Sequence, residues 1–166
     1  MRWPGSKKPK RPYKLFQIEP TLQCGLSCVM CPWSEMRATA GTMTWDTFTR
    51  IAGYLPQAES VDFTGGGEPT LSAHLVEMVR MAKEAGCEAG FSTNAARLTP
   101  ELSETLVSLS LDWISFSVDA ATASLYERIR QGANFDTLIS NIRALQSIKE
   151  KRNIHTPRMM MVFVMM

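Results

Sequence analysis

The sequence predicts an α/β fold, a partial and open (β/α) barrel of the TIM type with about five parallel strands. Short apolar segments alternate with amphipathic helical segments along the chain, as parallel strands joined by crossover helices require. Polar or glycine-rich motifs follow each of the first four apolar segments. Apolar residues make up 45% of the 166 residues and charged residues 20%, which is the balance of one globular domain.

Five apolar segments are expected to form the strands. Each is rich in β-branched, aromatic or other apolar residues and is bounded by Pro, Gly or short polar residues. The expected strands are residues 15–19, 61–64, 89–92, 113–118 and 159–166. Because parallel strands of this kind pack between other layers, we expect the sheet to be buried on both faces.

Helical periodicity separates these strands. Thr44 is expected to cap a helix that stops before Pro56, and Thr99 to precede a helix with Pro100 at its first position. A further helix is expected to end at Gly86. The apolar faces comprise Phe48, Ile51, Ala52 and Leu55; Leu75, Met78, Val79 and Ala82; Leu102, Leu106 and Leu109; and Phe135, Leu138, Ile139, Ile142 and Leu145.

Charge and composition exclude several classes of function. A net charge of +2 does not indicate a nucleic-acid or membrane-surface protein. Six basic residues precede Glu19, so residues 1–14 are expected to form a flexible basic arm and residues 15–166 the core; an arm that contacts an acidic partner is the alternative. The chain has neither a signal-peptide pattern nor an apolar stretch of transmembrane length. Four cysteines then favour metal or redox work in the cytoplasm.

The last expected strand raises a packing problem. It is fully apolar, and no helix follows it to cover it. We therefore expect the sequence to be the N-terminal part of a longer barrel, incomplete at its C-terminus. A partner chain that supplies the missing barrel wall is the alternative.

The loop after the first strand carries three cysteines in a C-x₃-C-x₂-C spacing. Cys24, Cys28 and Cys31 are one ligand short of a closed four-ligand site, so a centre bound there keeps one open position. The leading hypothesis is a [4Fe–4S] cluster with one free iron. The alternatives are a structural zinc site completed by His74 or Cys87, or simply buried thiols. Otherwise Cys87 is expected to be a small core residue.

Three further motifs lie where ligands bind in α/β layers, at the carboxyl ends of strands. Gly65–Pro69 can bring its backbone close to a ligand, although a plain tight turn would explain the same residues. Ser92–Asn94 and Ser117–Asp119 end the third and fourth strands with short polar side chains. Such groups can hydrogen-bond sugar hydroxyls or an amino-acid head group, or can serve only as caps and turns.

Taken together, these motifs closely resemble the radical S-adenosylmethionine (radical SAM) superfamily. The resemblance rests on Ile18–Cys31, Thr64–Thr70, Ser92–Asn94 and Ser117–Asp119, and it extends from Leu15 to the end of the chain. The opening and the glycine turn are most similar to the branch that often carries a SPASM-type C-terminal extension.

The resemblance implies an enzyme. Its [4Fe–4S] cluster would reductively cleave S-adenosylmethionine to a 5′-deoxyadenosyl radical, which abstracts hydrogen from a substrate that the sequence does not identify; peptide modification is one candidate. An electron donor of the flavodoxin or ferredoxin kind is implied as a partner. The rival interpretation is a catalytically incomplete metal-binding fragment, a structural zinc or Fe–S module.

The resemblance also implies roles for individual residues, and no catalytic residue is assigned. Cys24, Cys28 and Cys31 would bind three irons. The residues implied in cofactor binding are Met30, Gly66, Gly67, Glu68, Ser92, Asn94, Ser117, Asp119 and Arg130. Backbone around Gly66–Glu68 would bind the amino group, the strand tips the ribose or carboxylate, and Arg130 the methionine carboxylate. Met30 stands where many members have an aromatic residue against the adenine.

Overall fold

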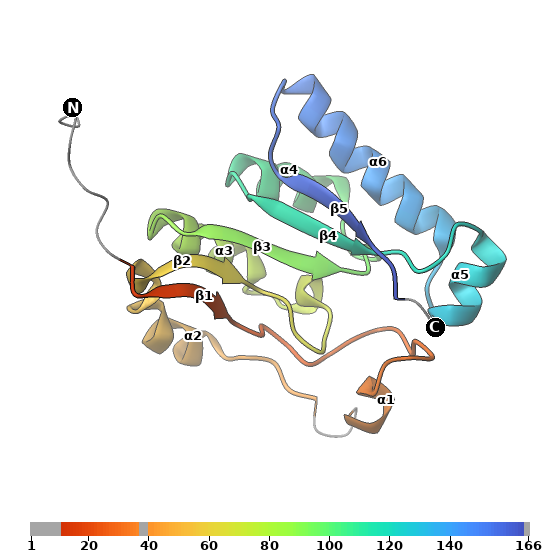
Figure 1. The fold of residues 1–166 in the computed structure, drawn as a ribbon, viewed down its shortest axis with the longest axis horizontal. Helices are drawn as coiled ribbons and strands as arrows, with labels where there is room; N and C mark the ends of the chain where they lie inside the picture. Colours follow the sequence, from red (N-terminus) through yellow and green to blue (C-terminus); the bar gives the residue numbers. More distant parts are fainter. Residues whose placement is uncertain (1–10, 37–39, 165–166) are drawn as a thin grey trace.

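The computed structural model describes residues 11–36 and 40–164. It contains one sheet of five parallel strands whose spatial order follows their order in the chain (Figure 1). The strands are β1 (Tyr13–Gln17), β2 (Ala58–Asp62), β3 (Glu88–Thr93), β4 (Trp113–Ser117) and β5 (Arg158–Val162). Strands β1 and β5 form the two edges, so the sheet is open. The predicted open α/β arrangement is confirmed.

The helices follow the strands in alternation. The α-helices are α1 (Trp33–Met36), α2 (Trp45–Ala52), α3 (Leu75–Glu84), α4 (Pro100–Ser108), α5 (Ala123–Ile129) and α6 (Phe135–Lys151). Two short 3₁₀ turns are η2 (Leu55–Gln57) and η3 (Pro69–Leu71). The Thr44 hydroxyl accepts a hydrogen bond from the Thr47 N–H, so the predicted cap is confirmed. The helix start predicted at Thr99 and Pro100 is also confirmed, and the Thr99 hydroxyl caps it by accepting from the Leu102 N–H.

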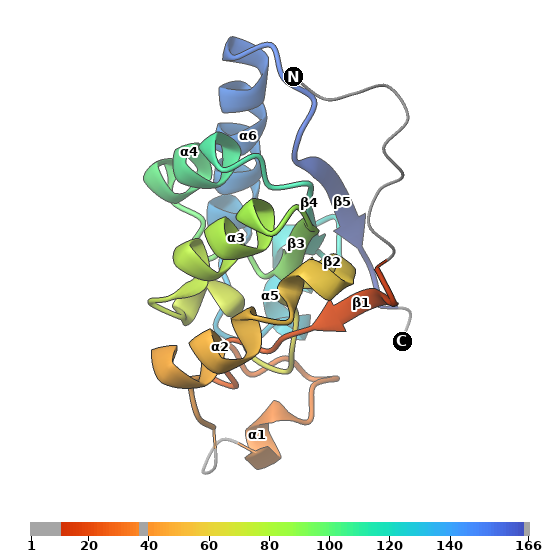
Figure 2. The same cartoon turned by 90° about the vertical axis from the view of Figure 1, so that its left-hand side faces the viewer.

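The core lies between the sheet and the helices α2, α3, α4 and α6, which stand on the same side of the sheet (Figure 2). Phe16, Val61 and Ala89 are paired across β1, β2 and β3, and Val61 and Ala89 are fully buried. Phe91 and Ile114 form the corresponding pair between β3 and β4. Since neighbouring strands of a parallel sheet keep paired residues on one face, these rows form a continuous apolar layer under the helices.

The opposite face of the sheet differs from the expectation. Leu15 on β1 and Met160 on β5 are 52% and 45% exposed, so the prediction of burial on both faces is wrong for the described residues. On this face the ring of Trp113 lies over Gly90, where a Cβ atom would stand 2.2 Å from the ring. The helices cover only one side of the strands, and nothing in the described chain packs over the exposed apolar side chains at the two edges.

The element boundaries differ in places from the predicted ones. Strand β1 begins at Tyr13, two residues before the predicted start, and β5 ends at Val162. The predicted arm lies mainly outside the described residues, but Arg11 donates hydrogen bonds to the carbonyls of Ala58 and Ala85. Helices α1 and α5 were not predicted, since each is too short to carry a periodic apolar face.

Candidate functional site

The three cysteines lie on the loop that leaves the carboxyl end of β1. Cys24, Cys28 and Cys31 are each partly buried, and the Cys31 N–H donates to the Cys28 carbonyl at 3.0 Å, which closes a turn between them. In Figure 1 this loop runs in orange from β1 toward α5, below the ends of the other strands. The loop therefore lies at the edge of the sheet where the predicted glycine and strand-end motifs also lie.

The glycine turn after β2 holds one side of this loop. The Glu68 N–H donates to the Gln23 carbonyl at 2.8 Å. A Cβ atom at Gly67 would stand 2.2 Å from the Thr21 carbonyl oxygen and 2.7 Å from that of Gln23. Only glycine permits this approach, because any side chain would push the cysteine loop away from the turn.

The end of α5 holds the other side of the loop. The Ser27 N–H donates to the Gln131 carbonyl and the Val29 N–H to the Ile129 carbonyl, both at 2.9 Å. Gly132 has a φ of +89°, and a Cβ atom placed on it would lie 3.5 Å from the Gly25 carbonyl oxygen. The loop is thus fixed between two segments that are distant in sequence.

The Glu68 side chain joins the glycine turn to the end of β3. Glu68 is 4% exposed, and its carboxylate accepts hydrogen bonds from the Thr93 hydroxyl, the Thr70 hydroxyl and the Asn94 N–H, each at 2.7 Å. Its N–H and carboxylate are therefore both engaged by the chain itself. The carbonyls of Gly66 and Gly67 accept no hydrogen bond within residues 11–36 and 40–164.

Two side chains from later elements reach the thiols. The Asn94 Nδ2 donates to the Cys24 sulfur at 3.9 Å, and the Arg130 Nη1 donates to the Cys28 sulfur at 3.7 Å. Asn94 follows β3 and Arg130 ends α5. Arg130 also pairs with the Asp119 carboxylate at 2.6 Å, and its buried Nε has no hydrogen-bond partner in the described chain.

Burial raises the pKa of the Cys24 thiol, and the negative charge of Glu68 adds to the rise. Burial also raises the pKa of Cys28, whereas the Arg130 cation acts in the opposite direction. The loop without a ligand therefore favours protonated thiols at these two positions. A metal centre must displace those protons, since the thiolate is the form that binds metal.

The other predicted residues divide into free and engaged groups. The hydroxyls of Ser92 and Ser117 are half-buried at the ends of β3 and β4 and have no hydrogen-bond partner in the described ranges. Met30 is half-buried within the cysteine loop. The Asp119 side chain, in contrast, is fully buried against Arg130 and the Val164 N–H. Sequence reasoning did not assign Glu19, whose carboxylate accepts the Gly66 N–H, although Glu19 lies within the quoted first motif.

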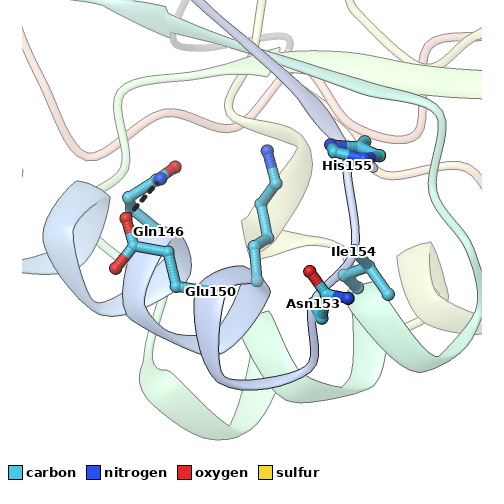
Figure 3. A pocket seen from close by; sticks show the side chains of 6 residues that line it. Gln146, Glu150, Asn153, Ile154 and His155 are labelled. Atoms are coloured by element: carbon cyan, nitrogen blue, oxygen red, sulfur yellow. Dashed lines mark hydrogen bonds between the residues drawn. The ribbon is translucent and has the colours of Figure 1, made fainter.

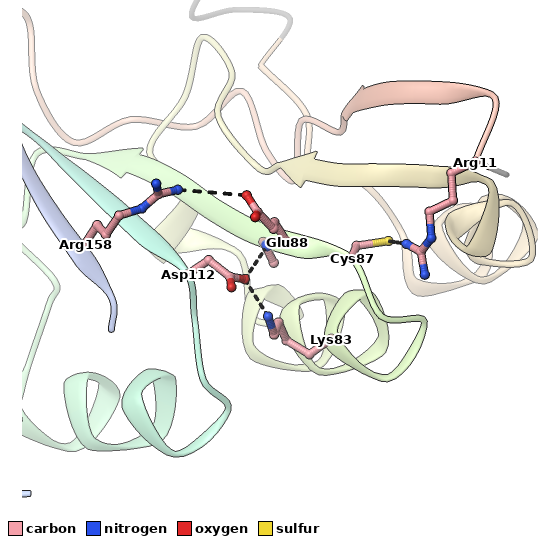
Figure 4. A network of polar contacts seen from close by, with 7 residues as sticks. Arg11, Lys83, Cys87, Glu88, Asp112 and Arg158 are labelled. Atoms are coloured by element: carbon pink, nitrogen blue, oxygen red, sulfur yellow. Dashed lines mark hydrogen bonds and ion pairs between the residues drawn. The ribbon is translucent and has the colours of Figure 1, made fainter. Parts of the chain in front are cut away.

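Cys87 lies at the opposite end of the sheet. It directly precedes β3, is 2% exposed and contacts the carbonyls of Leu55 and Ala58, so it is the core residue that was predicted (Figure 4). His74 packs its ring on Trp45, with ring centroids 5.3 Å apart. Neither residue therefore joins the three loop cysteines.

A separate pocket also lies away from the cysteines. It has a volume of about 340 Å³ and is lined by the end of α6 and the segment before β5 (Figure 3). Gln146 and Glu150 bond to each other at its wall, and the buried Lys149 donates to the Pro157 carbonyl at 2.7 Å. These contacts satisfy one another and form no cluster with a catalytic pattern.

The residues at the cysteine loop fit a [4Fe–4S] cluster better than a single ion. No three His, Cys, Asp or Glu side chains of residues 11–36 and 40–164 converge as ligands of one metal ion. A cubane cluster does not need such convergence, because each thiolate binds a different iron. The donor set is three thiolates on one partly exposed loop, and the unpaired Arg130 Nε offers a hydrogen-bond donor beside it. Both features suit a cluster whose open iron binds a charged ligand.

Comparison with known proteins identifies the family. The sequence profile of the Radical SAM superfamily matches residues 18–163. The chain is 36% identical over 109 residues to the tungsten-containing aldehyde ferredoxin oxidoreductase cofactor-modifying protein of Pyrococcus furiosus, which covers 64% of this chain and 31% of that protein. It is 32% identical over 131 residues to the mycofactocin maturase MftC of Mycobacterium tuberculosis, which covers 78% of this chain and 33% of MftC. The chain spans about a third of the length of these curated relatives.

Solved structures share the fold. Streptococcus suis SuiB bound to the precursor peptide SuiA aligns with a TM-score of 0.66 at 18% identity, over 90% of this chain and 32% of SuiB. In the described part of the chain, no helix has both the length and the apolar character needed to cross a membrane. The family match extends from the end of β1 to the end of β5. Because it covers most of the chain, the chain belongs to the Radical SAM superfamily.

Proposed function

We propose that the chain binds a [4Fe–4S] cluster through Cys24, Cys28 and Cys31 and binds S-adenosylmethionine at the open iron. When bound, these groups supply reductive cleavage of S-adenosylmethionine to methionine and a 5′-deoxyadenosyl radical that abstracts hydrogen from a substrate. The observation that carries the proposal is the cysteine loop itself. It is held between the glycine turn and α5, with polar side chains of Asn94 and Arg130 on two of its sulfurs.

Different groups of the chain would contact the cluster and the ammonium group of the cofactor. Asn94 and Arg130 donate hydrogen bonds toward the sulfurs, and such bonds stabilise the anionic thiolates that irons require. The free carbonyls of Gly66 and Gly67 suit an ammonium group, which can only donate. The N–H groups of Gly66 and Glu68 are already engaged within the chain, whereas these two carbonyls can still accept from a ligand.

The remaining contacts concern the ribose, the carboxylate and the adenine. The free hydroxyls of Ser92 and Ser117 are better candidates for the ribose than Asp119, whose carboxylate is engaged within the chain. The unpaired Nε of Arg130 is available to a carboxylate. Met30 can pack on the purine with its polarisable thioether.

We propose a peptide as the substrate, because SuiB, which shares this fold, is bound to a precursor peptide in its crystal structure. We also propose that an electron donor of the flavodoxin or ferredoxin kind supplies the electron.

Anaerobic reconstitution with iron and sulfide tests the proposal. We expect about four irons and four sulfides per chain, and Cys28→Ala should abolish this content. Cys87→Ala is the matched control, because Cys87 is buried at the other end of the sheet and should leave the content unchanged. With dithionite and S-adenosylmethionine, the reconstituted chain should release 5′-deoxyadenosine.

Two results would contradict the proposal in different ways. Stoichiometric zinc without iron would favour a structural zinc module. A stable cluster without 5′-deoxyadenosine would limit the function of this chain to cofactor assembly and would make it a catalytically incomplete fragment.

A further inference from the structure

The buried carboxylate of Asp119 is committed to the chain's own groups. Its side chain is fully buried, and its backbone adopts a left-handed conformation with a φ of 58°. One oxygen, Oδ1, accepts the Val164 N–H at 2.8 Å. The other, Oδ2, lies 2.6 Å from the Arg130 Nη2 and forms an ion pair with it that lacks hydrogen-bond geometry. Asp119 therefore connects the turn after β4 with the segment after β5 and the end of α5.

The partner of Asp119 faces the cysteine loop. Arg130 uses Nη2 toward Asp119 and Nη1 toward the Cys28 sulfur, so the two contacts come from different nitrogens of one planar guanidinium. The Arg130 side chain is 11% exposed. At this depth an unpaired charge is costly and weakly screened, so the carboxylate decides how much positive charge Cys28 experiences.

We propose that Asp119 acts through Arg130: its carboxylate offsets part of the positive charge of the guanidinium beside Cys28, so that the pair sets the reduction potential of the cluster at this thiolate. The proposal rests on the proposed function, because it requires a cluster bound through Cys28. It gives Asp119 a role other than contact with the cofactor. Reduction adds negative charge to the cluster, so a nearby cation favours the reduced state and a nearby anion opposes it.

Two substitutions separate the two charges. Asp119→Asn removes the negative charge but keeps the amide oxygen that can accept the Val164 N–H, and Asn tolerates the left-handed backbone. Arg130→Met removes the positive charge at similar length. Arg130→Lys retains the charge but cannot contact two partners with a planar fork. The substitutions thus predict shifts of opposite sign, which a merely structural defect would not produce.

The experiment is a potentiometric titration of the reconstituted chain, followed by electron paramagnetic resonance after its iron content has been measured. We expect Asp119→Asn to favour the reduced cluster on the order of tenfold, which is about 59 mV for one electron. Arg130→Met should favour the oxidised cluster, and Arg130→Lys should return the potential most of the way to that of the unsubstituted chain.

Several results would overturn the inference. Equal potentials in all variants that carry a full cluster would overturn it, as would shifts of the same sign in Asp119→Asn and Arg130→Met. If Asp119→Asn fails to fold, the comparison of Arg130→Met with Arg130→Lys decides, and equal potentials there reject the role of the charge. An unsubstituted chain that assembles no cluster would instead reject the proposed function, and this inference with it.

Discussion

The polar groups at the two ends of the sheet differ in how completely they are paired within the chain. At the amino end, Lys83 pairs with Asp112 at 2.5 Å, and the same carboxylate oxygen accepts the Ala89 N–H at 2.7 Å (Figure 4). Arg158 lies 3.9 Å from Glu88 across β5 and β3. These charges bind one another or the backbone, so this end ties the strands and helices together.

At the carboxyl end the polar groups are only partly satisfied. The hydroxyls of Ser92 and Ser117 are free within the described chain, and Arg130 has an unpaired Nε. Burial also holds the pKa of Cys24 and Cys28 above the ordinary value, so these thiols stay protonated until a metal centre binds. In parallel α/β layers, this is the end where ligands bind, so the unpaired groups lie where we propose the cofactor site.

The largest effect is expected from Gly67→Ala. The added Cβ would stand 2.2 Å from the Thr21 carbonyl, which is backbone and cannot rotate away. The cysteine loop must then move off the glycine turn, so we expect cluster content after reconstitution to fall at least about tenfold. Iron and sulfide analysis measures this.

Gly53→Ala is the matched control for that substitution. Gly53 has nothing within 4 Å of a would-be Cβ and a φ of −60°, so alanine should be neutral or stabilise the chain by about 0.4–1 kcal/mol. A full cluster in Gly67→Ala would show that the close approach does not hold the loop.

A smaller effect is expected when a hydrogen-bonded carboxylate loses its charge at either end of the sheet. Glu68→Gln removes an acceptor of three short hydrogen bonds and turns an amide group toward donors, which should cost about 1.5–3 kcal/mol of unfolding free energy and reduce cluster content. Asp112→Asn should cost about 1 kcal/mol but leave cluster content unchanged. Denaturant unfolding and iron analysis separate the two variants. Cluster loss in Asp112→Asn would contradict the distinction between the two ends of the sheet.

The smallest effect concerns pH and Lys149. Burial lowers the pKa of Lys149 below its ordinary value of 10.5, so the unfolded chain binds this proton more tightly than the folded one. The free energy of unfolding therefore increases as the pH rises from the folded-state pKa toward 10.5. Below that range, the full cost of burying the charged amine is present. We expect the unsubstituted chain to gain less than about 1 kcal/mol over Lys149→Met between pH 7 and pH 10. Thermal melting at both pH values tests this, and a constant difference would contradict it.

Much of the fold could be predicted because short sequence patterns indicate the helices and strands. Thr44 and Thr99 sit before periodic apolar faces, and both prove to be caps. The five strands have the predicted order, since alternation of strands and helices permits few arrangements. Helix α5 could not be predicted, because its seven residues bury only Tyr126 and it is held by its neighbours. Burial on both faces was wrong because apolar strands indicate a buried environment without stating what covers them.

The candidate site divides in the same way. The proposed donor set could be predicted from the sequence by itself, because the spacing of Cys24, Cys28 and Cys31 is local and three thiolates leave one position open. Only the tertiary structure decided which groups meet those thiols. Asn94 lies 70 residues from Cys24 in the chain and Arg130 lies 102 from Cys28, and no local pattern encodes contacts of that separation. The packing of α5 and the glycine turn around one loop brings them together, and it leaves Ser117 free while Asp119 is engaged.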